Sequence, residues 1–158
     1  MRGVYTASYE ISGVAAAKTL LYLTAPSNAV VEIFSAKVTQ RGVTTPEQLD
    51  IGLAKISTLG SPTATTLTPK KTEDGSASSG CTVKGNVTAS EPTYEVDGSS
   101  IPLYLDHQDP NNLGGYYFDP LPEERPTVAP SATVGIKLLT NPSNTYTLVV
   151  SITFREIG

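Results

Sequence analysis

The chain has 158 residues, a formal net charge of −4 and a pI of about 4.9. A chain of this length is expected to form one domain, because single domains commonly hold about 100 to 200 residues. Its acidic balance argues against a nucleic-acid-binding surface, which normally concentrates Lys and Arg on one face.

The cysteine content and the hydropathy of the chain indicate the cellular compartment in which it is made. The only cysteine, Cys81, cannot form an intrachain disulfide, and no apolar run approaches the roughly 20 residues that span a bilayer. The segment after Met1 lacks the basic and apolar regions of a secretory leader. We therefore expect synthesis in a reducing cytoplasm and no membrane partner.

Hydrophobic alternation predicts the first strand near the N-terminus, where one face carries Tyr5, Ala7, Tyr9 and Ile11. The next segment has two interpretations. Residues 14–23 contain good helix formers, whereas Gly13 and Pro26 bracket the segment closely, so a turn followed by a strand at 18–24 is preferred. Residues 45–49 are compatible with one helical turn that has Pro46 at its first position.

Further strands are predicted along the rest of the chain, each bounded by Gly, Pro, Asn or Ser: 29–39, 49–57, 63–68, 81–89, 133–140 and 146–158. In 81–89 the apolar face carries Cys81, Val83, Val87 and Ala89. The C-terminal strand is the clearest, with one face formed by Leu148, Val150, Ile152 and Phe154. Long loops are predicted near 69–80 and 97–115. The fold prediction is a single all-β domain over residues 1–158, an antiparallel β-sandwich resembling a jelly roll.

Candidate catalytic and metal-binding residues are few. His107 is the only histidine, which excludes a multi-histidine metal site, and its polar neighbours predict a solvated side chain. Cys81 lies on an apolar strand face, which predicts a buried, inert thiol. Five carboxylates could in principle include a glycosidase pair or a calcium site, but Trp is absent and the spacing does not match an EF-hand: Asp106, Asp109, Asp119, Glu123 and Glu124. No enzymatic activity, cofactor or metal is predicted.

Residues 116–130, "YYFDPLPEERPTVAP", form a segment that we call the strap. Its four prolines remove backbone donors and favour an extended polyproline conformation, so the strap cannot be a central strand. Two interpretations stay open. The strap docks against another subunit through aromatic anchors, at a small cost in entropy; or it is a rigid crossover between two sheets, with its aromatic residues in the core.

Three stretches carry a resemblance: "AAKTLLYLTAPSNAVVEIFSAKVT", "GGYYFDPLPEERPTVAPSATVGIKLL" and the terminal "SITFREIG". Together they resemble small uncharacterised virion proteins encoded in tailed-bacteriophage genomes. The resemblance covers most of the chain and brings no catalytic residues with it. It implies a jelly-roll-like β-sandwich on a phage particle, as a head decoration protein or a fibre or tail accessory module.

The function expected from this resemblance is a capsid decoration or cementing protein, made in the host cytoplasm and located in the virion. It would bind the major capsid protein lattice and stabilise the assembled head, as a homo-oligomer with a trimer favoured. The alternative is a glycan- or receptor-binding module that uses the loop of Tyr104 and Asp106. Lys70 and Lys71 are expected in a mobile loop away from the shell. The residues expected at the subunit or capsid interface are Tyr116, Tyr117, Phe118, Leu121 and Arg125, with Tyr5 in a possible N-terminal arm.

Overall fold

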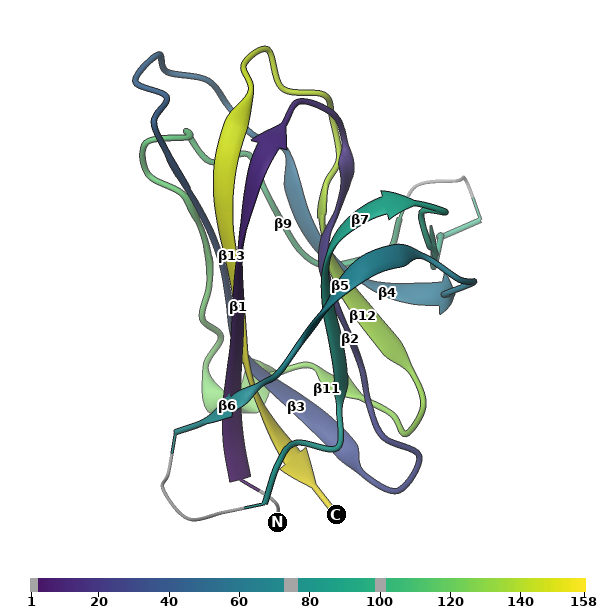
Figure 1. The fold of residues 1–158 in the computed structure, drawn as a ribbon. Coiled ribbons are helices and arrows are strands. Elements are labelled where there is room, and N and C mark those ends of the chain that lie inside the picture. The colour runs from purple at the N-terminus through teal and green to yellow at the C-terminus, as the bar shows by residue number, and fades with distance from the viewer. Residues whose placement is uncertain (1–2, 73–76, 99–101) are drawn as a thin grey trace.

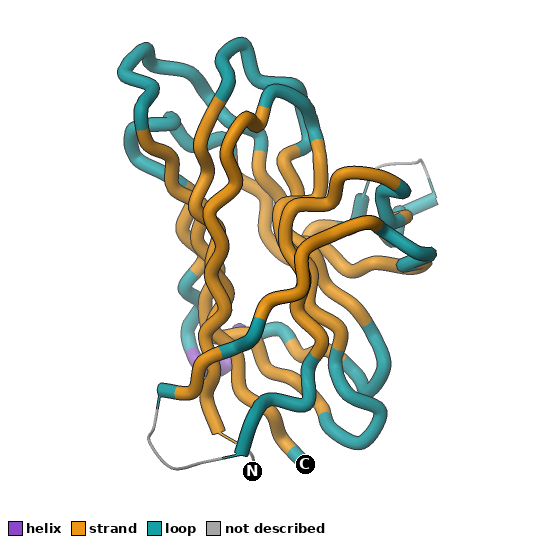
Figure 2. The backbone as a smooth tube through the Cα atoms, viewed as in Figure 1, coloured by secondary structure: helices purple, strands orange, loops and turns teal. Residues whose placement is uncertain are grey.

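The computed structural model describes residues 3–72, 77–98 and 102–158. Within these ranges the chain forms strands and one short 3-10 turn, and the strands build two antiparallel sheets that pack face to face (Figure 1). Loops gather at the two ends of the long strands (Figure 2). The prediction of an all-β sandwich is therefore confirmed.

The first sheet has β13 at its centre. The long strands pair over most of their length, so that Gly3 of β1 lies opposite Glu156 of β13, and Arg41 of β3 lies opposite Thr147. Short strands cover the two edges. Across the sheet, the order is β10 (Tyr116–Phe118), β3 (Val30–Arg41), β13 (Tyr146–Ile157), β1 (Gly3–Val14) and β6 (Lys70–Lys71), and β11 (Thr127–Val128) also pairs with β3.

The second sheet has β2 and β12 in its middle. Across this sheet, the order is β5 (Thr63–Leu67), β7 (Thr82–Ala89), β2 (Lys18–Thr24), β12 (Thr133–Leu138), β4 (Ile51–Thr58) and β8 (Thr93–Tyr94), and β9 (Tyr104–Gln108) pairs with β4 beside β8. The helical turn η1 (Pro122–Glu124) lies between β10 and β11.

The connections between the sheets follow a jelly roll. The eight strands of the jelly roll lie in the order β1-β13-β3-β10 in the first sheet and β2-β12-β4-β9 in the second. Along the chain, β1, β2, β3 and β4 alternate between the two sheets. The later strands pair with them in reverse order: β9 with β4, β10 with β3, β12 with β2 and β13 with β1. This is the arrangement of an eight-stranded jelly roll. β1 begins and β13 ends at the same end of the sandwich (Figure 1).

The segment between β4 and β9, residues 59–103, is an insertion into this jelly roll. β5 and β7 extend the second sheet beyond β2, whereas β6 pairs with β1 of the first sheet. The chain therefore crosses from one sheet to the other between β5 and β6, along one side of the sandwich.

The core lies between the sheets and uses the predicted inward faces. Every residue of the predicted apolar face of the last strand is buried: Leu148, Val150, Ile152 and Phe154. On β1, Tyr9 is only half-buried, and the rest of the predicted face is buried: Tyr5, Ala7 and Ile11. In β7, Val83 lies in the core, whereas Val87, predicted on the same face, lies in a second cluster, and Asn86 between them has a left-handed φ of 57°. Ala89 is exposed against expectation. Cys81 is buried, as predicted.

A second apolar cluster covers the outer face of the second sheet. Tyr22 lies between the inward-facing Leu21 and Leu23, so its ring points outward, where it packs with Ala54, Ile56, Val87 and Tyr94. The Tyr94 ring lies over Gly135, where a Cβ atom would come within 2.5 Å of the tyrosine hydroxyl. β2 is consequently buried on both faces, which explains its unbroken apolar run.

The preferred strand at 18–24 is confirmed, and the helical alternatives at 14–23 and 45–49 are wrong. The two predicted long loops are wrong in part. Lys70 and Lys71 form β6 beside β1, and Tyr104–Gln108 forms β9 beside β4, because each short segment completes the hydrogen bonding of a neighbouring strand. Residues 73–76 and 99–101 of these loops lie outside the described residues.

Candidate functional site

The strap runs along one edge of the first sheet. β10 pairs with β3 at residues 36–38, and β11 pairs with β3 at residues 31–32. Between them, the Ile33 amide donates a hydrogen bond of 3.0 Å to the Pro126 carbonyl oxygen. The strap therefore covers the β3 edge of one sheet and is not itself a crossover between the sheets. The core position that this interpretation gave to the aromatic residues is correct for Tyr116. The polyproline conformation of the strap is interrupted by the 3-10 turn η1.

Two residues predicted at the interface lie in the core instead. Tyr116 and Tyr5 each have no exposed surface, and the Tyr5 ring stacks on Phe154 with ring centroids 5.7 Å apart. Burial raises the pKa of Tyr116 far above its ordinary value, and the nearby Asp106 carboxylate raises it further. The predicted surface contact is therefore wrong for both tyrosines, because alternation along β10 and β1 turns them inward.

Residues 113–130, which we call the strap region, expose both apolar and acidic side chains. Of the six large hydrophobic side chains exposed in the described chain, three come from residues 113–121. Leu121 is 64 % exposed, Leu113 59 % and Tyr117 51 %, while Phe118 is half-buried against the core. Three predicted interface positions thus remain at or near the surface: Tyr117, Phe118 and Leu121.

Arg125 anchors the strap to the sheet. Its guanidinium carbon lies 4.0 Å from the centroid of the Phe34 ring, and its Nη1 atom lies 3.8 Å from Oε1 of Glu32. Arg155 of β13 contacts the other oxygen of Glu32 and lies over the same ring at 5.4 Å. Arg125 is consequently a partly buried side chain with partners inside the protein, and its contact with a subunit or the capsid stays a prediction.

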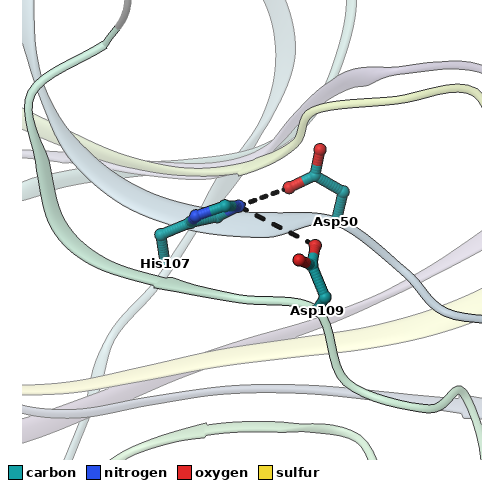
Figure 3. Close-up of polar contacts among 3 residues, drawn as sticks. All are labelled: Asp50, His107 and Asp109. Carbon is teal, nitrogen blue, oxygen red and sulfur yellow. Dashed lines mark hydrogen bonds and ion pairs between the residues drawn. The ribbon is translucent and has the colours of Figure 1, made fainter.

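A second feature lies at the edge of the other sheet, on β9. The His107 Nε2 atom lies 2.6 Å from Oδ1 of Asp50 and 3.8 Å from Oδ1 of Asp109 (Figure 3). The imidazole ring stacks on Tyr104 with centroids 4.7 Å apart. His107 is exposed, as predicted, but its carboxylate partner Asp50 was not predicted. Asp50 was missed because it is 57 residues away along the chain, and only the pairing of β9 with β4 brings it close.

The residues of the alternative glycan site are already engaged. Tyr104 uses one face of its ring to stack on His107, and it also lies against Gly52. Asp106 accepts a hydrogen bond of 2.8 Å from Nε2 of Gln108 and lies near the buried Tyr116 hydroxyl. These side chains do not present a free stacking platform with a free hydrogen-bonding group beside it.

A shallow pocket of about 220 Å³ lies on the second sheet, lined by residues 16–18, 87–89 and Glu91. Its charged groups have partners: Lys18 donates to the Asn86 amide oxygen at 2.6 Å, and Glu91 accepts from the backbone and hydroxyl of Thr19. The exposed carboxylates Asp119, Glu123 and Glu124 lie on the strap, away from this pocket.

Comparison with known proteins found no matching family model, no similar curated protein and no similar solved structure. The described part of the chain contains no helix with the length and hydropathy of a membrane span.

Proposed function

We propose that this chain is a non-enzymatic structural protein of a phage virion, which cements the capsid by docking its strap region on the major capsid protein lattice. One observation supports this most. Residues 113–121 expose three large apolar side chains, and the pairing of β10 and β11 with β3 holds the strap in place. The proposal also rests on the resemblance of the sequence to phage virion proteins.

The strap is ordered before it meets a partner. β10 and β11 are hydrogen-bonded to β3, Glu124 donates its amide to the Leu121 carbonyl at 2.9 Å, and Arg125 is held by Phe34 and Glu32. Docking a fixed surface loses little conformational entropy, so more of the contact energy appears as affinity. Tyrosine is one of the residues most enriched at the energetic centres of interfaces, and Tyr117 is exposed on this surface.

Cementing would follow from linked binding. A protein that binds the assembled lattice but not the separated capsomers stabilises the lattice by an amount that grows with the logarithm of its free concentration. At a concentration of 100 times the dissociation constant, this stabilisation is about 2.7 kcal/mol per site. Contacts of this size, repeated over a shell, oppose the outward strain of packaged DNA.

The functional experiment uses capsids of the parent phage that lack this protein. Purified wild-type protein added back is expected to restore heat resistance in a saturable manner. Tyr117→Ala and Leu121→Ala should weaken the rescue by about tenfold or more, since side chains at the centre of interfaces often contribute above 1 kcal/mol. Leu103→Ala and Val96→Ala are matched controls, because these side chains are also apolar and exposed but lie outside the strap region.

Two results would contradict the proposal. Depleted capsids as heat-resistant as complete ones, but unable to adsorb to cells, would move the protein to the receptor-binding class. Binding of the isolated protein to host glycans, lost in Tyr104→Ala, would favour the glycan module.

We also propose that the protein is a homo-oligomer, with a trimer favoured, because repeated copies on a lattice gain avidity. Light scattering coupled to size exclusion is expected to give a mass above the protomer mass of 16.6 kDa. A monomer at all accessible concentrations would contradict this part of the proposal without affecting binding to capsids.

A further inference from the structure

One imidazole and two carboxylates converge at the start of β4. The Nε2 atom of His107 and one oxygen each of Asp50 and Asp109 all lie within 4.8 Å of one another. Figure 3 shows the ring nitrogen pointing between the two carboxylates of Asp50, which directly precedes β4, and Asp109, which directly follows β9. Two chain segments that are distant in sequence thus contribute to one small cluster.

The backbone fixes these segments next to one another. His107 lies opposite Gly52 in the β4–β9 pair, and just before β4 the Leu49 amide donates to the Pro110 carbonyl at 2.9 Å. The carbonyl of Asp50 accepts a hydrogen bond of 2.8 Å from the Leu139 amide. Asp50 and Asp109 therefore each lie beside a residue whose backbone is paired, and the distance between them is set by the sheet.

The ring of His107 is also oriented by its neighbours. Tyr104 stacks on it with an interplanar angle of 20°. Tyr104 can occupy this position because residue 52 is glycine: a Cβ atom there would come within 2.7 Å of the tyrosine ring. Such packing around a ligand residue holds its nitrogen in one direction, as the residues that surround metal ligands do.

Among the described residues, Asp50 and Asp109 form ion pairs with His107 and with no lysine or arginine. Nε2 can donate at most one proton, and it lies close to Asp50, whereas the Asp109 oxygen at 3.8 Å is beyond hydrogen-bond distance. A cation in place of the proton would interact with both carboxylates at once.

We propose that Asp50, His107 and Asp109 bind one divalent transition-metal ion of the Zn²⁺ class. One nitrogen and two oxygen ligands suit such an ion, whereas Ca²⁺ prefers oxygen ligands alone. Ligand atoms about 2.1 Å from a tetrahedral ion are about 3.4 Å apart. The observed separations from Nε2, 2.6 Å and 3.8 Å, lie on either side of this value, and rotations of partly exposed side chains reconcile them.

The ion would leave a fourth position for water and would join the chain after β9 to the start of β4. This inference is independent of the proposed function, because it concerns the second sheet and makes no use of the strap.

The test is calorimetric titration of Zn²⁺ into tag-free protein that has been stripped of metal. Wild-type protein is expected to bind one equivalent, and His107→Gln is expected to lose the saturable heat. Asp50→Asn and Asp109→Asn should each weaken the affinity by about tenfold or more. Asp119→Asn is the matched control, since it removes an exposed carboxylate of the strap and should bind like wild type. Cys81→Ala should also bind normally, which excludes a thiolate ligand.

A spectroscopic readout identifies the ligand atom. Because the chain has only one histidine, the imidazole nitrogens give a single pair of NMR signals. Zn²⁺ should shift the signal of Nε2 far more than that of Nδ1. Absence of saturable binding by folded wild-type protein would overturn the inference. Wild-type affinity in folded His107→Gln or Asp109→Asn protein would also overturn it.

Discussion

Glu156 shows how one residue can hold two distant parts of this molecule together. Its side chain is fully buried, and its Oε1 atom accepts hydrogen bonds from the Ser79 hydroxyl and from the Gly80 and Cys81 amides. Glu156→Ala would remove the acceptor of one buried and two partly buried hydrogen bonds. We expect a loss of about 3 kcal/mol in the free energy of unfolding, measured by urea denaturation.

The comparison for this substitution is Glu10→Ala, which removes an exposed carboxylate paired with Arg41. That change should cost less than about 1 kcal/mol, because exposed ion pairs contribute little. Equal losses in the two variants would contradict the role assigned to Glu156.

Glu47 gives a prediction about pH. The Ser143 amide, the Tyr146 hydroxyl and the Asn144 amide hydrogen-bond its carboxylate and lower its pKa from 4.5 to about 2. Because the folded pKa lies below the unfolded one, the carboxylate stabilises the fold above pH 4.5, and this stabilisation is lost as the pH falls towards about 2. Glu47→Gln should flatten the dependence of unfolding free energy on pH in that window. An unchanged slope would contradict this assignment.

The partners of these residues were not predictable from the sequence. Alternation correctly placed Leu148 and Phe154 in the core, since it depends only on the local period of a strand. The burial of Glu156 and the pairing of His107 with Asp50 depend on groups 57 or more residues away. No local pattern carries that information, and the candidate metal cluster was missed for this reason.

At the scale of elements, Arg125 should control how firmly the strap is held. Arg125→Ala removes the contact with the Phe34 ring and the ion pair with Glu32, so we expect a loss of about 1 kcal/mol in stability. The Ile33 amide, which donates to Pro126, should then exchange its hydrogen faster. Arg41→Ala is the control, because its side chain is 66 % exposed and lies outside the strap. Unchanged exchange at Ile33 would show that the strap is held by its strands alone.

The long strands were predicted with nearly correct bounds, whereas the short edge strands were not. β2 was placed at 18–24 and is Lys18–Thr24, because a buried strand carries its own apolar signal. β6 and β9 are polar, pair with a neighbour on one side and resemble loops in composition. The prolines correctly excluded the strap from the middle of a sheet, but they did not show which edge it covers.

At the scale of the whole molecule, the jelly roll joins the two ends of the chain. β13 lies between β1 and β3 and is the last strand of the chain. The first sheet therefore cannot form its central pairs until this C-terminal strand has docked. Pairing over the full length of the chain is slow to form, because the loop entropy must be lost before the contacts are gained. We therefore expect refolding on a scale of milliseconds to seconds, as measured by tyrosine fluorescence after dilution from urea.

The decisive version of this prediction is a truncation. Removal of residues 145–158 deletes β13, leaves β1 and β3 without their shared partner strand and takes away the Glu156 acceptor. This fragment is expected to lose its cooperative unfolding transition and its strand-type circular dichroism, whereas removal of Ile157 and Gly158 alone should leave both. A synthetic peptide of residues 145–158 should restore the transition in the fragment, since the empty position in the sheet offers hydrogen bonds on both sides. A fragment that unfolds cooperatively without the peptide would show that the second sheet and its outer apolar cluster can fold without the first.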